Sequence, residues 1–208
     1  MFTGIITGLG RITAHEPIQG TAYDPKGGGQ RITVACGDWD LSDVAIGDSI
    51  AHSGCCLTIV EKGPGTLKSD VSTHSLSIVT GLSVGSLVNL EKSMTLADKL
   101  GGHLVTGHVD TSGVVLQWKN IAESWLLEVE VTNTLGRFIA KKGSITINGV
   151  SLTVNEVADA ADKTRFQINV IPHTYQVTNF SELREGDRVN VEIDTIARYV
   201  ERMTQYAR

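Results

Sequence analysis

The chain contains 208 residues, of which 41% are hydrophobic and 20% charged, and its formal net charge is −5. These values are typical of a folded globular protein and exclude a disordered chain. No apolar run approaches the roughly 20 residues that span a bilayer, and the acidic balance without a Lys/Arg stripe argues against nucleic-acid binding. The N-terminus has no basic flank, so it does not read as a signal peptide. Three cysteines cannot all pair, and we expect reduced thiols and a cytoplasmic protein.

Short β-rich segments closed by turn residues follow one another along the chain. In the first half they lie at residues 10–16, 30–37, 48–54, 56–65 and 86–92. The second half has them at residues 113–120, 125–133, 143–149, 151–159, 165–172 and 187–194. Residues 20–30 read as a hairpin loop without chemistry, and helical turns are predicted at 73–82 and 134–142. Strands of this spacing, with 22 glycines for tight corners, predict antiparallel sandwiches or barrels.

The last segment, residues 194–208, has a different period. Its apolar residues recur at helical spacing, and Asp194 or Thr195 can cap the start; they are Ile196, Tyr199, Val200, Met203 and Tyr206. A helix of about 14 residues is marginal alone, so this apolar stripe needs a surface. Packing on its own barrel and contact with another chain both remain open.

The two halves carry the same motifs in the same order. Residues 49–61, SIAHSGCCLTIVE, recur at 144–156 as SITINGVSLTVNE, and VNLE at 88–91 recurs as VNVE at 189–192. Shorter pairs follow the same order, namely Thr7-Gly8 with Thr106-Gly107 and His74-Ser75 with His173-Thr174. The offsets of 95 to 101 residues have the size of a domain rather than of a solenoid repeat. We infer a duplicated protein with one polar-lined pocket in each half.

Two histidines could carry chemistry. His103 and His108 are five residues apart, which is about 140° around a helix and opposite faces of a strand, so a shared metal is disfavoured. A single functional histidine beside the flexible pair Gly101-Gly102 and a hydrogen-bonded structural histidine both remain open.

Two adjacent cysteines are the other candidates. If a strand begins after the turn at Ser53-Gly54, Cys56 and Thr58 share one face, while Cys55 and Leu57 share the other. Only one thiol can then face a pocket, and the alternative is that both are small buried side chains. The spacing fits no zinc site, and the chain has no P-loop, GxGxxG, GxSxG or HExxH motif.

The chain is similar along nearly its whole length to the riboflavin synthase family. The similarity rests on MFTGII, SIAHSGCCLTIVE, LADKLGGHLVTGHVD, KKGSITINGVSLTV, VIPHT followed by VTNF, VNVEID and ARYVERM. It implies two six-stranded Greek-key β-barrels, at residues 1–95 and 96–193, and a C-terminal helix at 194–208 through which three chains assemble. It also implies that no metal or organic cofactor is needed.

The resemblance implies a reaction between two molecules of 6,7-dimethyl-8-ribityllumazine. One molecule donates a four-carbon unit to the other, which gives riboflavin and 5-amino-6-ribitylaminouracil. Each barrel would bind one molecule, with the active site between the N-terminal barrel of one chain and the C-terminal barrel of its neighbour. Because the two substrates are identical, the same barrel structure can bind each of them, while the donor and acceptor roles require different side chains. Association with a lumazine synthase shell is a further partner that the resemblance suggests.

The resemblance assigns catalysis to His108, Cys56 and Ser49. His108 would move a proton to and from the acidic C7 methyl group, and Ser49 and Cys56 would assist nucleophile addition or hold the acceptor ring. The N-terminal pocket would also contain Phe2, Thr3, Gly4, Ile5, Ile6, Leu57, Thr58, Asp70, Val71, Ser72, Thr73, His74, Ser75, Gly107 and Val109. The C-terminal pocket would contain Lys142, Ser151, Leu152, Thr153, Ile171, Pro172, His173, Thr174, Tyr175 and Gln176, with Asp194 nearby. His52 has no catalytic part in the family pattern.

Three positions depart from that pattern. HSL at 74–76 stands where Glu-Thr-Leu is usual, Val79 where Thr is usual, and Asn148 where Asp is frequent. Two other functions are alternatives to this enzyme. Lumazine proteins of luminous bacteria bind a lumazine or flavin without catalysis as monomers, and they lack the histidine at 108 and the assembly helix. A flavin reductase module would need a nicotinamide domain, which no stretch here supplies.

Overall fold

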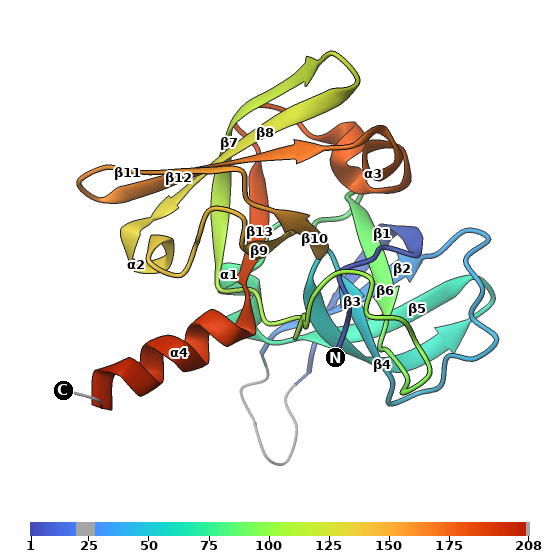
Figure 1. Cartoon of the computed structure of the whole chain (residues 1–208). Helices are drawn as coiled ribbons and strands as arrows, with labels where there is room; N and C mark the ends of the chain where they lie inside the picture. The colour runs from blue at the N-terminus through green and yellow to red at the C-terminus, as the bar shows by residue number, and fades with distance from the viewer. Residues whose placement is uncertain (20–27, 207–208) are drawn as a thin grey trace.

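The computed structural model describes residues 1–19 and 28–206, so most of the loop predicted at 20–30 lies outside the described residues. The described chain is mainly β-strand. It forms one barrel-like sheet in each half, followed by a helix at the C-terminal end (Figure 1). The prediction of a duplicated all-β fold with a C-terminal helix is confirmed.

The first half forms a closed antiparallel barrel with the strand order β1-β2-β5-β4-β3-β6. Strands that are distant in sequence pair in this order, as in a Greek key, and β1 closes the barrel by pairing with both β2 and β6. The strands are β1 (Gly8–Pro17), β2 (Gln30–Ala35), β3 (Ser49–His52), β4 (Cys55–Gly63), β5 (Thr66–Val71) and β6 (Leu87–Lys92).

The second half repeats this order in a curled sheet, β10-β9-β13-β7-β8-β12-β11. It has seven strands because the counterpart of β4 is interrupted at Val154 and Asn155, which leaves β10 and β11 at the two ends of the sheet. The strands are β7 (Thr111–Ile121), β8 (Ser124–Thr132), β9 (Ser144–Ile147), β10 (Val150–Thr153), β11 (Glu156–Asp159), β12 (Lys163–Val170) and β13 (Arg188–Ile193).

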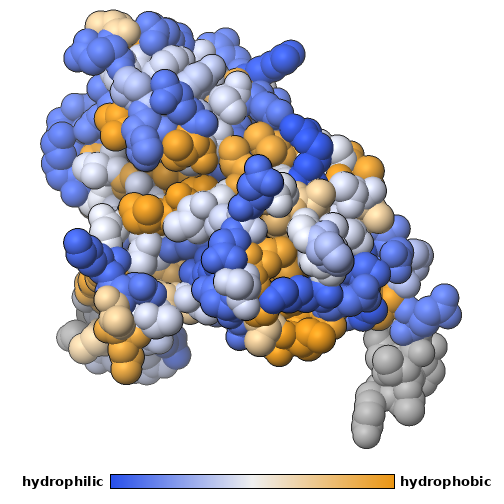
Figure 2. All heavy atoms as spheres, turned by 90° about the vertical axis from the view of Figure 1, so that its right-hand side faces the viewer, coloured by the Kyte–Doolittle hydropathy of each residue, from blue (hydrophilic) through white to orange (hydrophobic). Residues whose placement is uncertain are grey.

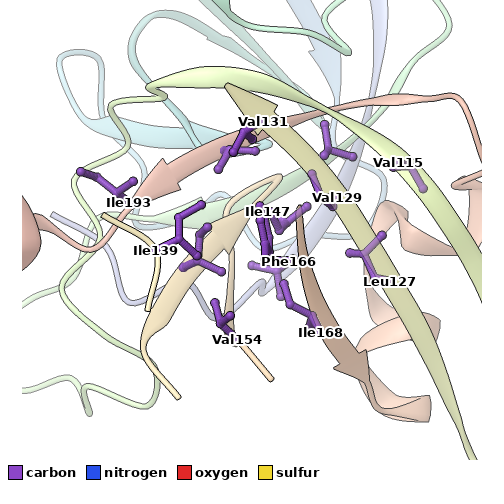
Figure 3. Packing of buried hydrophobic residues seen from close by; sticks show 14 of the residues in the cluster. Val115, Leu127, Val129, Val131, Ile139, Ile147, Val154, Phe166, Ile168 and Ile193 are labelled. Carbon is purple, nitrogen blue, oxygen red and sulfur yellow. The ribbon is translucent and has the colours of Figure 1, made fainter. Parts of the chain in front are cut away.

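Each barrel has its own hydrophobic core. Strand residues alternate between this core and the outer face, as the period of two requires. The second core includes Leu127 and Val129 of β8 and Phe166 and Ile168 of β12, which lie opposite one another on the inner face of the paired strands (Figure 3). The first core is a separate cluster that includes Ile32 and Leu67. Because the cores are separate, the barrels depend on a distinct set of contacts to stay together.

In the described part of the chain, four short helices accompany the sheets: α1 (Thr73–Ile78), α2 (Asn133–Gly136), α3 (Pro172–Val177) and the 3₁₀ turn η1 (Asn179–Glu182). The helical turns predicted at 73–82 and 134–142 correspond to α1 and α2. Helix α3 lies where a strand was expected to end, and it follows β12 as α1 follows β5. Pro172 at its first turn is a signal that could have found it.

Helix α4 (Thr195–Tyr206) projects away from both sheets (Figure 1). All five residues of its predicted apolar stripe are at least half exposed. Packing of this stripe on its own barrel, one of the two alternatives left open by the sequence, is therefore excluded. No helix among the described residues is long and apolar enough to cross a membrane.

Candidate functional site

A segment from the second half lies on the outer face of the first barrel. The carbonyl of Gly107 accepts a hydrogen bond from the backbone N–H of Cys56 at 2.8 Å, and Val109 packs against the first core. Gly107 has φ +80°, and a Cβ there would lie 2.6 Å from the Cβ of Cys56. A glycine is therefore required both by the left-handed backbone and by the close approach.

The reciprocal segment from the N-terminus lies on the second barrel. The carbonyl of Gly4 accepts a hydrogen bond from the backbone N–H of Ser151, also at 2.8 Å, and Ile6 packs against the second core. Residues 2–6 were predicted to line the N-terminal pocket, whereas Gly4 and Ile6 contact the second barrel in this structure. The side chain of Phe2 stays on the first barrel, beside Ala51 and Cys56.

Two buried glutamates hold these crossing segments. Glu192 accepts hydrogen bonds from the N–H and hydroxyl of Thr106, at 2.8 and 2.6 Å, and from the N–H of Gly107 at 3.0 Å. Glu91 accepts three equivalent bonds from Thr3 and Gly4, at 2.7, 2.7 and 3.0 Å. Burial raises the pKa of the Glu91 carboxyl, and its hydrogen bonds oppose that rise.

These contacts correct the alignment of the two halves. Thr106-Gly107 corresponds to Thr3-Gly4, because both pairs bind the equivalent glutamates, and not to Thr7-Gly8 as the sequence suggested. The true equivalent of His108 is therefore Ile5. The two crossing segments differ at the position where one carries an imidazole.

The first candidate site is the outer face formed by β3 and β4. Ser49 lies opposite Thr58, and Ala51 lies opposite Cys56, so the four side chains share a face. Cys55 points into the core, where burial raises its pKa to about 12. The prediction that only one of the adjacent thiols faces outward is confirmed.

Several residues predicted for this site are engaged elsewhere. Leu57 and Val71 belong to the first core. Asp70 forms an ion pair with Arg31, with oxygen–nitrogen distances of 2.6 and 2.9 Å. Ser72 caps α1 by accepting a hydrogen bond from the N–H of Ser75. Thr73 and His74 are exposed, so the rim of this site is open in a single chain.

His108 lies at the edge of this face, and its side chain is exposed. It borders a hollow of about 440 Å³ whose other walls include Asp110, Arg198 and Tyr199. Arg198 of α4 donates a hydrogen bond to Asp110 at 2.8 Å. A corresponding hollow of about 550 Å³ lies beside Ile5, and it has no histidine in its lining.

The second candidate site is the equivalent face of β9 and β10. Ser144 lies opposite Thr153, and Thr146 lies opposite Ser151. Ser151 stands where the first site has Cys56, since each donates its N–H to the glycine of a crossing segment.

The residues predicted around Ser151 are mostly accessible. Lys142 has φ +66°, and its amine donates to Asn155 at 3.2 Å. Tyr175 stacks on Trp125 with ring centroids 4.1 Å apart, while Asp194 caps α4 by accepting from the N–H of Ile196. Leu152 is half-buried against the second core, Thr174 is half-buried in α3, and Ile171, Pro172, His173 and Gln176 are exposed. The side of the molecule that carries α3 shows orange hydrophobic groups among hydrophilic ones (Figure 2).

One residue of this site was missed by sequence reasoning. The imidazole Nδ1 of His103 is 2.7 Å from the hydroxyl of Ser151, and the side chain is 9% exposed. Its position directly after Gly101-Gly102 is a local signal, but nothing in the sequence indicates which barrel it contacts. In the described part of the chain no cluster of three or more His, Cys, Asp or Glu residues could hold a metal ion.

Comparison with known proteins agrees with this geometry. The family model described as lumazine binding domain matches the chain twice, at residues 3–93 and 106–194. The chain is 38% identical to the riboflavin synthase of Photobacterium phosphoreum, over 98% of this chain and 88% of that protein. It is 37% identical to the riboflavin synthase of Mycobacterium bovis over the full length of both.

The chain belongs to the riboflavin synthase family. The predicted resemblance is confirmed, as is the prediction of an enzyme of the transferase class. Among solved structures, it is similar to LumP complexed with 6,7-dimethyl-8-(1'-D-ribityl) lumazine, with a TM-score of 0.78 and 26% identity. LumP complexed with riboflavin has a TM-score of 0.80 and 26% identity. Both comparisons cover 93% of this chain and 99% of LumP.

Proposed function

We propose that this protein converts two molecules of 6,7-dimethyl-8-ribityllumazine into riboflavin and 5-amino-6-ribitylaminouracil. One molecule transfers a four-carbon unit to the other. Because two identical substrates supply every atom of both products, the reaction needs no oxidant or reductant. The family membership and the lumazine and riboflavin bound by the LumP neighbours support this substrate.

The observation that carries the proposal is the asymmetry of the repeated face. Both faces have the same strand pairing, and each is covered by a crossing segment from the opposite half. The first face has Cys56, and its crossing segment carries His108; the second face has Ser151, and its crossing segment carries Ile5. We call these faces the first seat (β3 and β4) and the second seat (β9 and β10). Two seats with the same backbone shape can each bind one copy of the same ligand, and their different side chains can serve the donor and the acceptor.

In this mechanism His108 is the general base at the first seat. Its exposed imidazole would take a proton from the C7 methyl of a bound lumazine, whose anion is delocalised into the ring system. Cys56 and Ser49, on the same outer face, would hold the second ring system or assist nucleophile addition. The two rings must stack in opposed orientation, and fixed seats lower the entropic cost of that encounter.

We further propose that the working form is a homotrimer in the cytoplasm. Both faces are open in the single chain, since Thr58, His108, Thr153 and Ile171 are all exposed. If the first seat of one chain packed against the second seat of a neighbouring chain, both binding faces would be covered and water would be excluded from them. Association with a lumazine synthase shell would place this protein beside the enzyme that makes its substrate.

A direct assay tests the proposed reaction. Purified protein is mixed with two equivalents of the lumazine and nothing else, and riboflavin is followed by absorbance and mass spectrometry. Riboflavin and the uracil product should appear in equal amounts, and His108→Ala should slow the reaction by about 100-fold or more. Tight lumazine binding without any riboflavin would favour the alternative, a non-catalytic lumazine-binding protein.

A further inference from the structure

Two short helices, α1 and α3, flank the seats, and we call them the rim helices. Each has six residues, all of them half-buried or exposed. Because β5 pairs with β4, with Ser69 opposite Ile59, the chain enters α1 beside the start of β4, where Cys56 lies. Helix α3 follows β12 in the same way on the second barrel. A helix this short is unstable alone, so contacts beyond its own residues determine where it lies.

The side chain of Asn190, in β13 of the second barrel, holds the end of α1. Its Oδ1 accepts a hydrogen bond from the backbone N–H of Thr80 at 2.7 Å, and its Nδ2 donates to the carbonyl of Thr80 at 3.1 Å. The same Nδ2 donates at 2.9 Å to the carbonyl of Ser53, in the turn between β3 and β4. One buried side chain of the second barrel therefore fixes both the turn and the rim helix of the first seat.

Asn89, in β6 of the first barrel, holds the second seat in the equivalent way. Its Oδ1 accepts a hydrogen bond from the backbone N–H of Asn179, just beyond α3, at 2.7 Å. Its Nδ2 donates to the side-chain oxygen of Asn179 at 3.0 Å, and to the carbonyl of Asn148, in the turn between β9 and β10, at 2.9 Å. The turn and the rim helix of the second seat thus depend on a strand of the first barrel.

The glutamate two residues further along each strand completes the pattern. Glu192, which follows Asn190, holds the crossing segment that covers the first seat and carries His108. Glu91, which follows Asn89, holds the crossing segment that covers the second seat. Side chains two apart on a strand project from the same face, so one strand can make both sets of contacts. Each of the strands β6 and β13 therefore contacts three parts of the seat on the opposite barrel.

We propose that Asn190 is a positioning residue for the first seat and Asn89 for the second, so that each barrel shapes the ligand site on the other. The asparagines act through the turn and the rim helix, whose positions set how well the site fits its ligand before the ligand arrives. Glu192 acts instead on the segment that carries His108. Asn190 therefore governs binding at the first seat, and Glu192 governs the chemistry there. The inference rests on the proposed function, because the seats are those of the two-lumazine reaction.

Hydrogen exchange of the ligand-free protein tests the crossed assignment directly. Asn190→Ala and Asn89→Ala are matched variants, since they remove the same side chain from equivalent strands. N190A should accelerate amide exchange at least about tenfold in residues 73–80 and change it less than about twofold in residues 172–179. N89A should do the reverse. Faster exchange only in the half that carries the substitution, or equal acceleration in both halves, would overturn the proposal.

Thr80→Pro tests the same contact from the side of the helix, and it gives a result even where N190A does not fold. Proline removes the N–H that donates to Asn190 and leaves β13 unchanged. The extended backbone of Val79 suits a residue that precedes proline. Residues 73–79 should again exchange at least about tenfold faster. Unchanged exchange in T80P would overturn the role of this hydrogen bond.

Titration with riboflavin tests the consequence for binding. Protection of residues 49–62 from exchange reports occupancy of the first seat, and protection of residues 144–156 reports occupancy of the second. N190A should raise Kd at the first seat by about 10-fold and change it less than about threefold at the second, and N89A should do the reverse. Equal weakening of both seats in each variant would mean that the asparagines only stabilise the fold.

Steady-state kinetics separate positioning from chemistry. In N190A, KM should rise by about 10-fold while kcat changes less than about threefold, because His108 is still held by Glu192. A fall in kcat with unchanged KM and unchanged riboflavin binding would overturn the positioning role. If the native protein binds riboflavin but makes none from the lumazine, the proposed function fails, while the exchange and binding results still decide this inference.

Discussion

His52 shows how far apart two copies of one motif can drift at a single position. Its side chain is fully buried in the first barrel, with Nδ1 3.1 Å from the carbonyl of Ile50 and no hydrogen-bond partner for Nε2 among residues 1–19 and 28–206. Burial lowers the pKa of His52 from 6.5 to about 4. Between these values the folded state binds fewer protons than the unfolded state. The stability due to neutral His52 is therefore present above pH 6.5 and is lost as the pH falls toward 4.

We expect His52→Ile to stabilise the protein. Isoleucine is the residue at the equivalent position, Ile147, and it removes an unpaired buried nitrogen that costs about 1–3 kcal/mol. The native protein should lose on the order of 3 kcal/mol from this histidine on acidification, and the variant should not. Urea unfolding near neutral pH and near pH 4 measures both effects. An equal acid loss in the two proteins would contradict the assignment to His52.

The glutamate clamps give a second prediction at the residue scale. Glu192→Gln replaces one acceptor oxygen by an NH₂ group that faces the N–H groups of Thr106 and Gly107. The turn that carries His108 should shift, and kcat should fall by about 10-fold to 100-fold. Glu91→Gln is the matched control, because it loosens the segment that carries Ile5, which has no group to titrate. Steady-state kinetics of both variants test this prediction, and kcat should fall further in E192Q than in E91Q. An equal or larger fall in E91Q would contradict the role of Glu192 in positioning His108.

At the scale of elements, local patterns in the sequence predicted most of the strands and helices. The alternation after Ser53-Gly54 correctly separated Cys56 from Cys55, because strand period is a local property. Helix α4 was predicted from its own spacing for the same reason. Helix α3 was missed because the apolar run before Pro172 reads as a strand that continues.

The crossing segments could not be predicted in this way. Thr-Gly occurs at both 3–4 and 7–8, and the sequence alone favoured the second pair. Only the hydrogen bonds to Glu91, almost ninety residues away, identify the first pair as the partner of Thr106-Gly107. The contact of His103 with Ser151 is missing from the sequence analysis for the same reason, since nothing local to either residue encodes it.

Helix α4 is the element whose sequence and environment disagree in the single chain. Its apolar stripe is exposed, with Met203 at 72% and Tyr199 at 67%. Burying such a stripe between chains would contribute about 1.5–3 kcal/mol for each large side chain. Deleting residues from Ile196 onward should therefore yield monomers with much lower activity.

A point substitution tests the same surface without shortening the chain. Met203→Glu adds a carboxylate on the apolar stripe, and Thr204→Glu adds the same charge about 100° around the helix. Analytical ultracentrifugation should find M203E dissociated and T204E assembled at equal concentrations. Trimeric M203E, or a trimer of the truncated chain, would show that α4 is not the assembly device.

At the scale of the whole molecule, the two barrels are joined by a reciprocal exchange of asparagines. Asn190 of the second half donates to the carbonyls of Ser53 and Thr80 in the first half, at 2.9 and 3.1 Å. Asn89 of the first half donates to the carbonyl of Asn148 in the second half at 2.9 Å. Both asparagine side chains are buried, at 2% and 0% exposure. The asparagine that lies two residues before each clamping glutamate in VNLE and VNVE thus holds the barrels together.

Two tight turns meet in close contact at the seam between the barrels, which consists of these asparagines and the turns at 53–54 and 148–149. Ser53 and Asn148 have φ of 45° and 48°, and each is followed by a glycine with positive φ. A Cβ on Gly54 would lie 2.8 Å from the backbone nitrogen of Gly149. Backbone therefore meets backbone, and the asparagine side chains satisfy carbonyls that would otherwise be buried and unpaired.

This seam should be what makes the two barrels unfold together. Each barrel has a separate core, so cooperativity between them depends on contacts such as those of Asn89 and Asn190. Either N89A or N190A should cost about 2–4 kcal/mol, because each leaves buried carbonyls without donors. The double variant should show two calorimetric transitions where the native protein, at the same concentration, shows one. A single transition that merely moves to lower temperature would mean that the crossing segments at Gly4 and Gly107, held by their glutamates, are sufficient to couple the barrels.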